Sequence, residues 1–243
     1  MQRTILQFGA YTAALLAFTL LLRFAGEASA GVDIYGSGAR RFLIDADAHA
    51  GGMLLAAFAM LVAPLFVAPV LVAWWHVIAA SDRAWGAIGL GLQAMGYLLL
   101  VGPFIAFGLI VQVADRFTDA AGVQQDAYAN DAEILAGFAT IGQQAAFGAI
   151  GAGLALCGWL LIRSKLLPAW IGWLSLVFGV VAFAFTFSFP LVIALHPVWA
   201  AAMAWGFYQA SRRKTADLGP ATMDPTPEPR SPWQSRSSGS QPS

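Results

Sequence analysis

Histidine and glutamine side chains are the polar groups that stand within or beside the long apolar stretches of this sequence. A histidine titrates near neutral pH and a glutamine offers both a donor and an acceptor, so such groups can bind a small polar ligand or relay a proton. When the chain is threaded as helices of alternating direction, one set falls at a similar level and forms a predicted outer cluster: His49, Gln112, Gln143, Gln144 and His196. The same side chains would equally serve as hydrogen bonds between helices, worth about 0.6 to 2 kcal/mol each. The sequence leaves both roles open.

A weak candidate for a metal site lies next to this set, at Asp45, Asp47 and His49. Asp45 and His49 are four residues apart and would share a helical face, and a carboxylate with an imidazole can hold zinc or another divalent ion. Any further ligand would have to come from elsewhere in the chain. The alternative is a solvated helix start, where aspartate is favoured by the helix dipole.

Recognisable catalytic and cofactor motifs are absent from the sequence. It contains no glycine-rich nucleotide loop, no G-x-S-x-G and no H-E-x-x-H, and its single cysteine, Cys157, cannot form an intramolecular disulfide. We therefore predict no catalytic residues and no cofactor, and we do not expect an enzyme. The formal net charge of zero gives no indication of a nucleic-acid partner.

The elements that must position these residues are predicted from the distribution of charge. The chain is 59% hydrophobic and only 11% charged, whereas a soluble domain carries about 25% charged residues. Charge-free runs long enough to cross a bilayer cover residues 4–22, 50–80, 84–114, 134–162 and 166–210. The last run is long enough for two helices, and Pro190 favours a break near residues 187–190. The prediction is an all-α bundle of six transmembrane helices, with spans at about 4–22, 50–80, 84–114, 134–162, 167–187 and 190–210.

None of these predicted spans contains a charged residue. Ion-driven transporters usually hold charged side chains within the bundle, so this absence argues against coupling to an intramembrane carboxylate. Arg23 and Glu27 fall in the first predicted loop. The N-terminal run with Ala28, Ser29 and Ala30 also resembles a signal peptide, but its length favours a retained helix.

Lysine and arginine residues predict the orientation of the bundle. The side that holds both termini carries more of them close to helix ends: Arg3, Arg83, Arg163, Lys165, Arg212, Arg213 and Lys214. The opposite side carries Arg23, Arg40, Arg41 and Arg116. The positive-inside rule therefore predicts cytoplasmic termini. Tryptophans predicted to anchor the bundle at the cytoplasmic interface are Trp74, Trp75, Trp85, Trp159, Trp170 and Trp173.

Two of the predicted spans contain stripes of small residues. Ala145, Ala149, Gly153 and Cys157 recur every four residues, as do Ala202, Gly206 and Ala210. Such stripes favour close helix packing, either within the bundle or in a homo-oligomer or complex with other membrane proteins.

Residues 215–243 are rich in Pro, Ser, Thr and Gly and are predicted to form a disordered cytoplasmic tail, separate from the transmembrane domain of residues 1–214.

Residues 166–180, which read LLPAWIGWLSLVFGV, resemble the fifth-helix start of a family of uncharacterised bacterial six-helix membrane proteins. The similarity is carried by Pro168, Trp170, Gly172 and Gly179 and by the end of the last span, where residues 205–208 precede Arg212. It implies six helices in a bacterial inner membrane, without an assigned activity or catalytic residues.

The sequence thus leaves two main functional hypotheses. The first is an integral membrane protein with a structural or regulatory role through partners. The alternative is a small-molecule transporter or channel that is not coupled to an intramembrane carboxylate. A lipid-modifying enzyme is the weakest hypothesis, because no nucleophile, base or metal set is recognisable.

Overall fold

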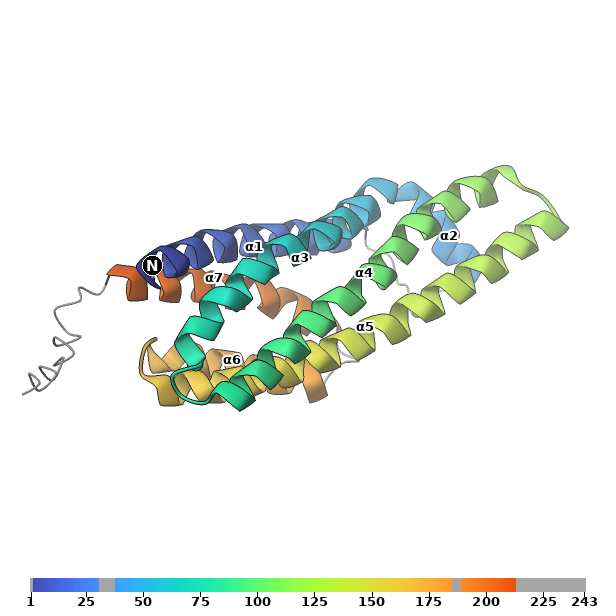
Figure 1. The fold of residues 1–243 in the computed structure, drawn as a ribbon. Helices are drawn as coiled ribbons and strands as arrows, with labels where there is room; N and C mark the ends of the chain where they lie inside the picture. The colour runs from blue at the N-terminus through green and yellow to red at the C-terminus, as the bar shows by residue number, and fades with distance from the viewer. Residues whose placement is uncertain (1, 31–37, 185–188, 213–243) are drawn as a thin grey trace, which may run out of the picture. The chain divides into compact units, whose positions relative to one another are not determined.

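The structure, a computed structural model, describes residues 2–30, 38–184 and 189–212, and this part of the chain is built from helices joined by short turns (Figure 1). The helices are α1 (Gln2–Ala30), α2 (Ala39–Ala48), α3 (Ala50–Ile78), α4 (Arg83–Asp119), α5 (Val123–Ser164), α6 (Ala169–Ala184) and α7 (Phe189–Arg212). No strand occurs within these ranges. The all-α prediction is confirmed, whereas the predicted tail at residues 215–243 lies outside the described residues.

Four helices, α1, α3, α4 and α5, are long and apolar enough to cross a membrane. The apolar helix α6 has 16 residues in its described part, and α7 has 24 residues with Pro190 in its first turn. The predicted count of six helices is not exact, because α2 is an additional short helix. Its charged residues alternate with apolar ones at helical spacing, so residues 39–48 form an amphipathic helix and not the predicted loop.

The long helices run in alternating directions. The start of α1, the turn at residues 79–82, the turn at residues 165–168 and the end of α7 gather at one end of the bundle (Figure 1). We call this the proximal end, and the end with the α4–α5 turn the distal end. α1 packs on α3, whereas α5 packs on both α4 and α6.

Local chemistry fixes where these helices begin and end. A carboxylate oxygen of Asp82 accepts a hydrogen bond from the Trp85 backbone nitrogen at 3.1 Å, which caps the start of α4. α5 begins after Gly122, whose φ of 60° is accessible to glycine, and it ends at Ser164, before Lys165, which has left-handed backbone geometry. Pro168 then directly precedes α6.

Glycines allow the closest helix contacts. At the crossing of α5 and α6, a methyl group added to Gly158 would lie 2.5 Å from the Leu176 backbone nitrogen and 2.8 Å from the Gly172 carbonyl oxygen. Gly153 of the first predicted stripe packs in the same way against Gly89 on α4, and Gly206 of the second packs against Ile171 on α6. These parts of the two stripes pack within the molecule.

At the distal end, α4 and α5 continue beyond the charge-free runs, and α2 packs against both of them there (Figure 1). We call α2 together with residues 115–119 and 123–133 the distal assembly. Phe42 and Leu43 of α2 are buried with Phe117 of α4. Arg40 of α2 forms an ion pair with Asp126 of α5. Most of the segment between the predicted spans at 84–114 and 134–162 is therefore helix and not a loop.

Candidate functional site

Arg23 is the residue around which the candidate site is built. α1 does not end near residue 22 but continues to Ala30, and it places Arg23 inside the bundle with a relative exposure of 1%. The predictions that Arg23 lies in a loop and that no span contains a charge are therefore wrong. The predicted span stopped at residue 22 because Arg23 is the first charged residue after the apolar run. Neither Arg23 nor the residues after it break a helix.

The Arg23 guanidinium is held by one charged, one sulfur and two aromatic contacts. Its Nε donates to an oxygen of Glu27 at 2.8 Å, and its Nη1 lies 3.7 Å from the sulfur of Met60. Its central carbon lies 5.0 Å from the ring centre of Phe104 and 5.4 Å from that of Phe147, within the range of cation–π attraction. Nη2 is buried and has no hydrogen-bond partner.

His196 occupies the same region of the core on α7. Its Nε2 shares a hydrogen bond with the hydroxyl of Tyr97 at 2.5 Å, with the donor set by the imidazole tautomer. Its ring centre lies 5.5 Å from that of Phe178, 5.9 Å from that of Trp199 and 6.5 Å from that of Phe147. Nδ1 of His196 is buried without a partner. We call Arg23, Glu27, Tyr97, His196 and the rings around them the Arg23 cluster.

Tryptophan side chains close the proximal side of this cluster. Nε1 of Trp199 donates to the hydroxyl of Ser175 at 3.0 Å, and the ring centres of Trp199 and Trp74 are 5.5 Å apart. Trp74 is fully buried and its Nε1 has no partner, so the prediction that it anchors at the interface is wrong. Trp85, Trp170 and Trp173 are exposed, as interfacial anchors would be.

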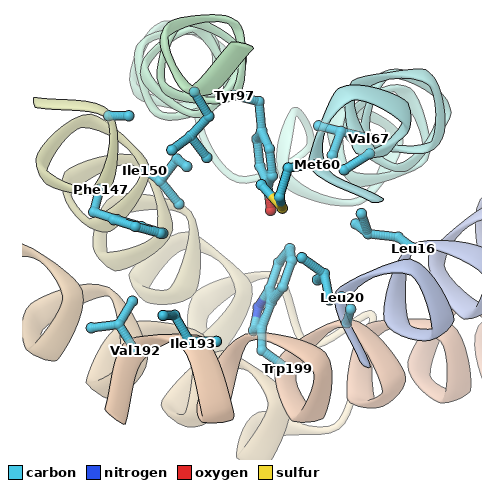
Figure 2. Close-up of a cluster of buried hydrophobic side chains, with 14 of the residues drawn as sticks. Leu16, Leu20, Met60, Val67, Tyr97, Phe147, Ile150, Val192, Ile193 and Trp199 are labelled. Atoms are coloured by element: carbon cyan, nitrogen blue, oxygen red, sulfur yellow. The ribbon is translucent and has the colours of Figure 1, made fainter. Parts of the chain in front are cut away.

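Figure 2 shows side chains of α1, α3, α4, α5 and α7 converging on the middle of the bundle. Tyr97 and Met60 point inward from α4 and α3, and Trp199 points toward them from α7. Leu16 and Leu20 line one side of this region. Arg23 stands one turn beyond Leu20 on α1, so its guanidinium borders an otherwise apolar and aromatic core.

The predicted polar set is distributed over different surroundings. His196 and Gln143 are buried, Gln144 is half-buried, and His49 and Gln112 are exposed. His49 lies at the junction of α2 and α3, where its Nδ1 is 2.9 Å from the backbone oxygen of Asp45. Within the described ranges, His49 and His196 share no hydrogen bond or ring contact, so the structure does not join them.

The residues of the weak metal candidate, Asp45, Asp47 and His49, lie at the end of α2 and at its junction with α3. A carboxylate oxygen of Asp45 lies 3.9 Å from Nε of Arg41 in an exposed ion pair. Among the residues that the structure describes, no three His, Cys, Asp or Glu side chains are grouped to hold a metal ion.

Sequence reasoning missed Arg23, Glu27 and Tyr97. The available signal was the spacing of Arg23 and Glu27, since opposite charges four residues apart at the end of an apolar run support helix continuation. Tyr97 carried no such signal, because its hydroxyl becomes significant only through contact with a residue 99 positions away.

Residues 11–209 match the family described as Domain of unknown function (DUF4386). No curated protein and no solved structure showed significant similarity to the chain.

Proposed function

Because the chain belongs to this family, whose description assigns no activity, we propose its function from its own buried contacts. The proposed function is that of an integral membrane protein that binds a small, largely apolar molecule through acceptor oxygens at the Arg23 cluster. Such a protein would act as a carrier or as a sensor of that molecule. This develops the small-molecule hypothesis drawn from the sequence.

The observation that carries this proposal is the unpartnered Nη2 of Arg23. A charged side chain inside a membrane bundle is costly, and such residues commonly mark binding or transport sites. A second unpartnered atom, Nδ1 of His196, belongs to a ring that also packs against Phe147. A ligand oxygen would satisfy the guanidinium N–H groups that the protein leaves open.

Charge balance indicates the kind of oxygen. Glu27 already neutralises Arg23 through a direct ion pair. An anionic ligand would leave the cluster with an excess negative charge in a medium of low dielectric constant, whereas a carbonyl oxygen would accept the same hydrogen bond without that penalty. The surrounding rings of Phe104, Phe147 and Phe178 suit an apolar or aromatic body. A neutral carbonyl compound fits both requirements.

The experiment uses three small probes with fused-ring bodies: tetralone, a neutral ketone; tetralin, which lacks the oxygen; and 1-naphthoate, an anion. Thermal unfolding of the detergent-solubilised protein should shift upward with tetralone more than with the other two. The double variant Arg23→Met/Glu27→Gln should lose this difference and remain folded, because an apolar replacement of a buried ion pair is often tolerated.

The matched control is Arg41→Gln/Asp45→Asn, which removes an exposed pair and should keep the ketone response. Equal shifts with tetralone and tetralin in the wild type would overturn the proposal. That outcome would leave Arg23 with a purely structural role.

A structural or regulatory role through partners is the second candidate. It is favoured by the distal assembly, in which α2 packs on helix ends that extend past the charge-free runs. Such a surface, outside the apolar part of the bundle, is accessible to other proteins. A protein that lacks any ketone response but requires the distal assembly for activity in cells would support this candidate.

The proposed setting is a bacterial inner membrane, with six spans and cytoplasmic termini. The alternating helix directions and the greater number of Lys and Arg residues at the proximal end support it. The resemblance of residues 166–180 to a bacterial membrane-protein family also implies an inner-membrane location.

A further inference from the structure

A surface groove lies between α4 and α5, on the outside of the bundle and away from the Arg23 cluster. Its volume is about 320 Å³. Leu109, Gln112 and Arg116 line it from one face of α4, and Asp131, Ile134 and Leu135 line it from one face of α5. The three- and four-residue spacings on both helices make each set a continuous stripe.

The groove crosses the level at which the apolar part of the bundle ends. Leu109 and Gln112 belong to the charge-free run that ends at residue 114, and Ile134 begins the next such run. Arg116 and Asp131 stand just beyond these limits. The apolar half of the groove therefore lies at the depth of lipid chains and its charged half at the depth of lipid headgroups.

The two charges in the groove have opposite sign and are open to a ligand. Arg116 and Asp131 are exposed, and within the described part of the chain neither makes an ion pair or a side-chain hydrogen bond. By contrast, Arg40 and Asp126 of the same distal region pair with each other. Ile134 beside them is 71% exposed, so the groove presents apolar surface as well.

We propose that this groove binds a phospholipid whose headgroup carries a phosphate and a primary amine. The guanidinium of Arg116 binds the phosphate, the carboxylate of Asp131 binds the ammonium group, and an acyl chain covers Leu109 and Ile134. Phosphate and guanidinium have complementary hydrogen-bonding geometry, and an ammonium group offers three donors to a carboxylate. A lipid with a headgroup of one charge sign would satisfy only one of the two side chains.

This inference concerns the lipid-facing surface and does not depend on ligand binding at the Arg23 cluster. The experiment is native mass spectrometry of the purified full chain with three lipids that have identical acyl chains: phosphatidylethanolamine, phosphatidylcholine and phosphatidylglycerol. The wild type should retain phosphatidylethanolamine most tightly, since a trimethylated amine cannot donate to Asp131 and phosphatidylglycerol has no amine.

Two variants test the assignment of each charge. Arg116→Gln should weaken phosphatidylethanolamine binding about fivefold, as expected for one exposed charge pair, and Asp131→Asn should reduce the preference over phosphatidylcholine by a similar factor. The controls Arg41→Gln and Asp119→Asn change exposed charges that do not line the groove, and both should bind lipid as the wild type does.

Other outcomes would overturn the proposal. Equal retention of the three lipids by the wild type would show that the headgroup is not recognised. A preference that survives both groove variants would place the lipid elsewhere. A dimer that depends on Arg116 and Asp131, without lipid selectivity, would identify the groove as an interface between copies of the chain.

Discussion

At the scale of single residues, the ion pair of Arg23 and Glu27 places a charge at the edge of the apolar core. Arg23 is 1% exposed and Glu27 is 29% exposed, so the guanidinium depends on its contacts while the carboxylate retains access to the surroundings. Breaking such a pair leaves an uncompensated charge, whereas replacing both partners removes the desolvation penalty as well. The two changes should therefore have different effects on stability.

We expect Glu27→Gln to lower the free energy of unfolding by about 1–3 kcal/mol, less than for a fully buried pair because Glu27 is partly exposed. The double variant Arg23→Met/Glu27→Gln should recover most of this loss. Thermal denaturation of the detergent-solubilised variants measures both effects. A double variant less stable than Glu27→Gln would show that the aromatic contacts of Arg23 matter more than its charge balance.

A second prediction concerns the hydrogen bond between Tyr97 and His196. Tyr97→Phe should lower the free energy of unfolding by about 1–3 kcal/mol, because it leaves both ring nitrogens of His196 without partners. Tyr11→Phe is the matched control, since Tyr11 is 68% exposed and should change stability by less than about 0.5 kcal/mol. Equal effects of the two changes in the same denaturation assay would contradict this assignment.

The sequence identified His196 as a candidate but could not supply its partners. Its position in an apolar run predicted a buried polar group, and the structure places it in the core. The identity of its partner, Tyr97, depends on how α4 and α7 cross, which no local pattern encodes. Arg23 was missed for the opposite reason, since charge was taken to end the span although tertiary contacts accommodate it.

At the scale of elements, the crossing of α5 and α6 is set by backbone contact. Gly151 and Gly158 of α5 face Gly179 and Gly172 of α6, and the atoms that an added methyl group would meet belong largely to the backbone. A backbone atom cannot move aside as a flexible side chain can. The repeated glycines were visible in the sequence, but which helix each would meet was not.

Gly158→Ala should therefore separate the two helices and lower the free energy of unfolding by about 1–3 kcal/mol. Gly148→Ala on the same helix is the control, because an added methyl group there meets nothing within 4 Å. That variant should be neutral or slightly more stable, since alanine favours a helix. A stability loss equal to that of Gly158→Ala would show that the contact does not determine the effect.

At the scale of the whole molecule, the distribution of charge predicts the helical bundle and its proposed orientation. Charge-free runs located the long helices because a bilayer-spanning helix needs uninterrupted apolar surface. They could not reveal α2 or the extensions of α4 and α5, since helices outside a membrane tolerate charge. The all-α class was predictable from composition, whereas the distal assembly required the structure.

The proposed orientation predicts the behaviour of reporter fusions. A phosphatase that is active only outside the cytoplasm should be inactive when fused after Lys214 and active when inserted in the turn at residues 120–122, between α4 and α5. Measurement of phosphatase activity in whole cells, with immunoblots for expression, tests both positions. The opposite pattern would reverse the assigned sides of the membrane.

The order of synthesis determines when Arg23 can make its contacts. α1 is made first, but the rings that cover its guanidinium belong to Phe104 and Phe147, which follow much later in the chain. Until α4 and α5 have been made, Arg23 lacks both rings, and its side chain can extend toward the aqueous surface, as long basic side chains do near helix ends. The final depth of α1 in the membrane is therefore set after its own insertion. A nascent chain arrested before Phe104 should hold α1 in a shallower position than the completed protein does.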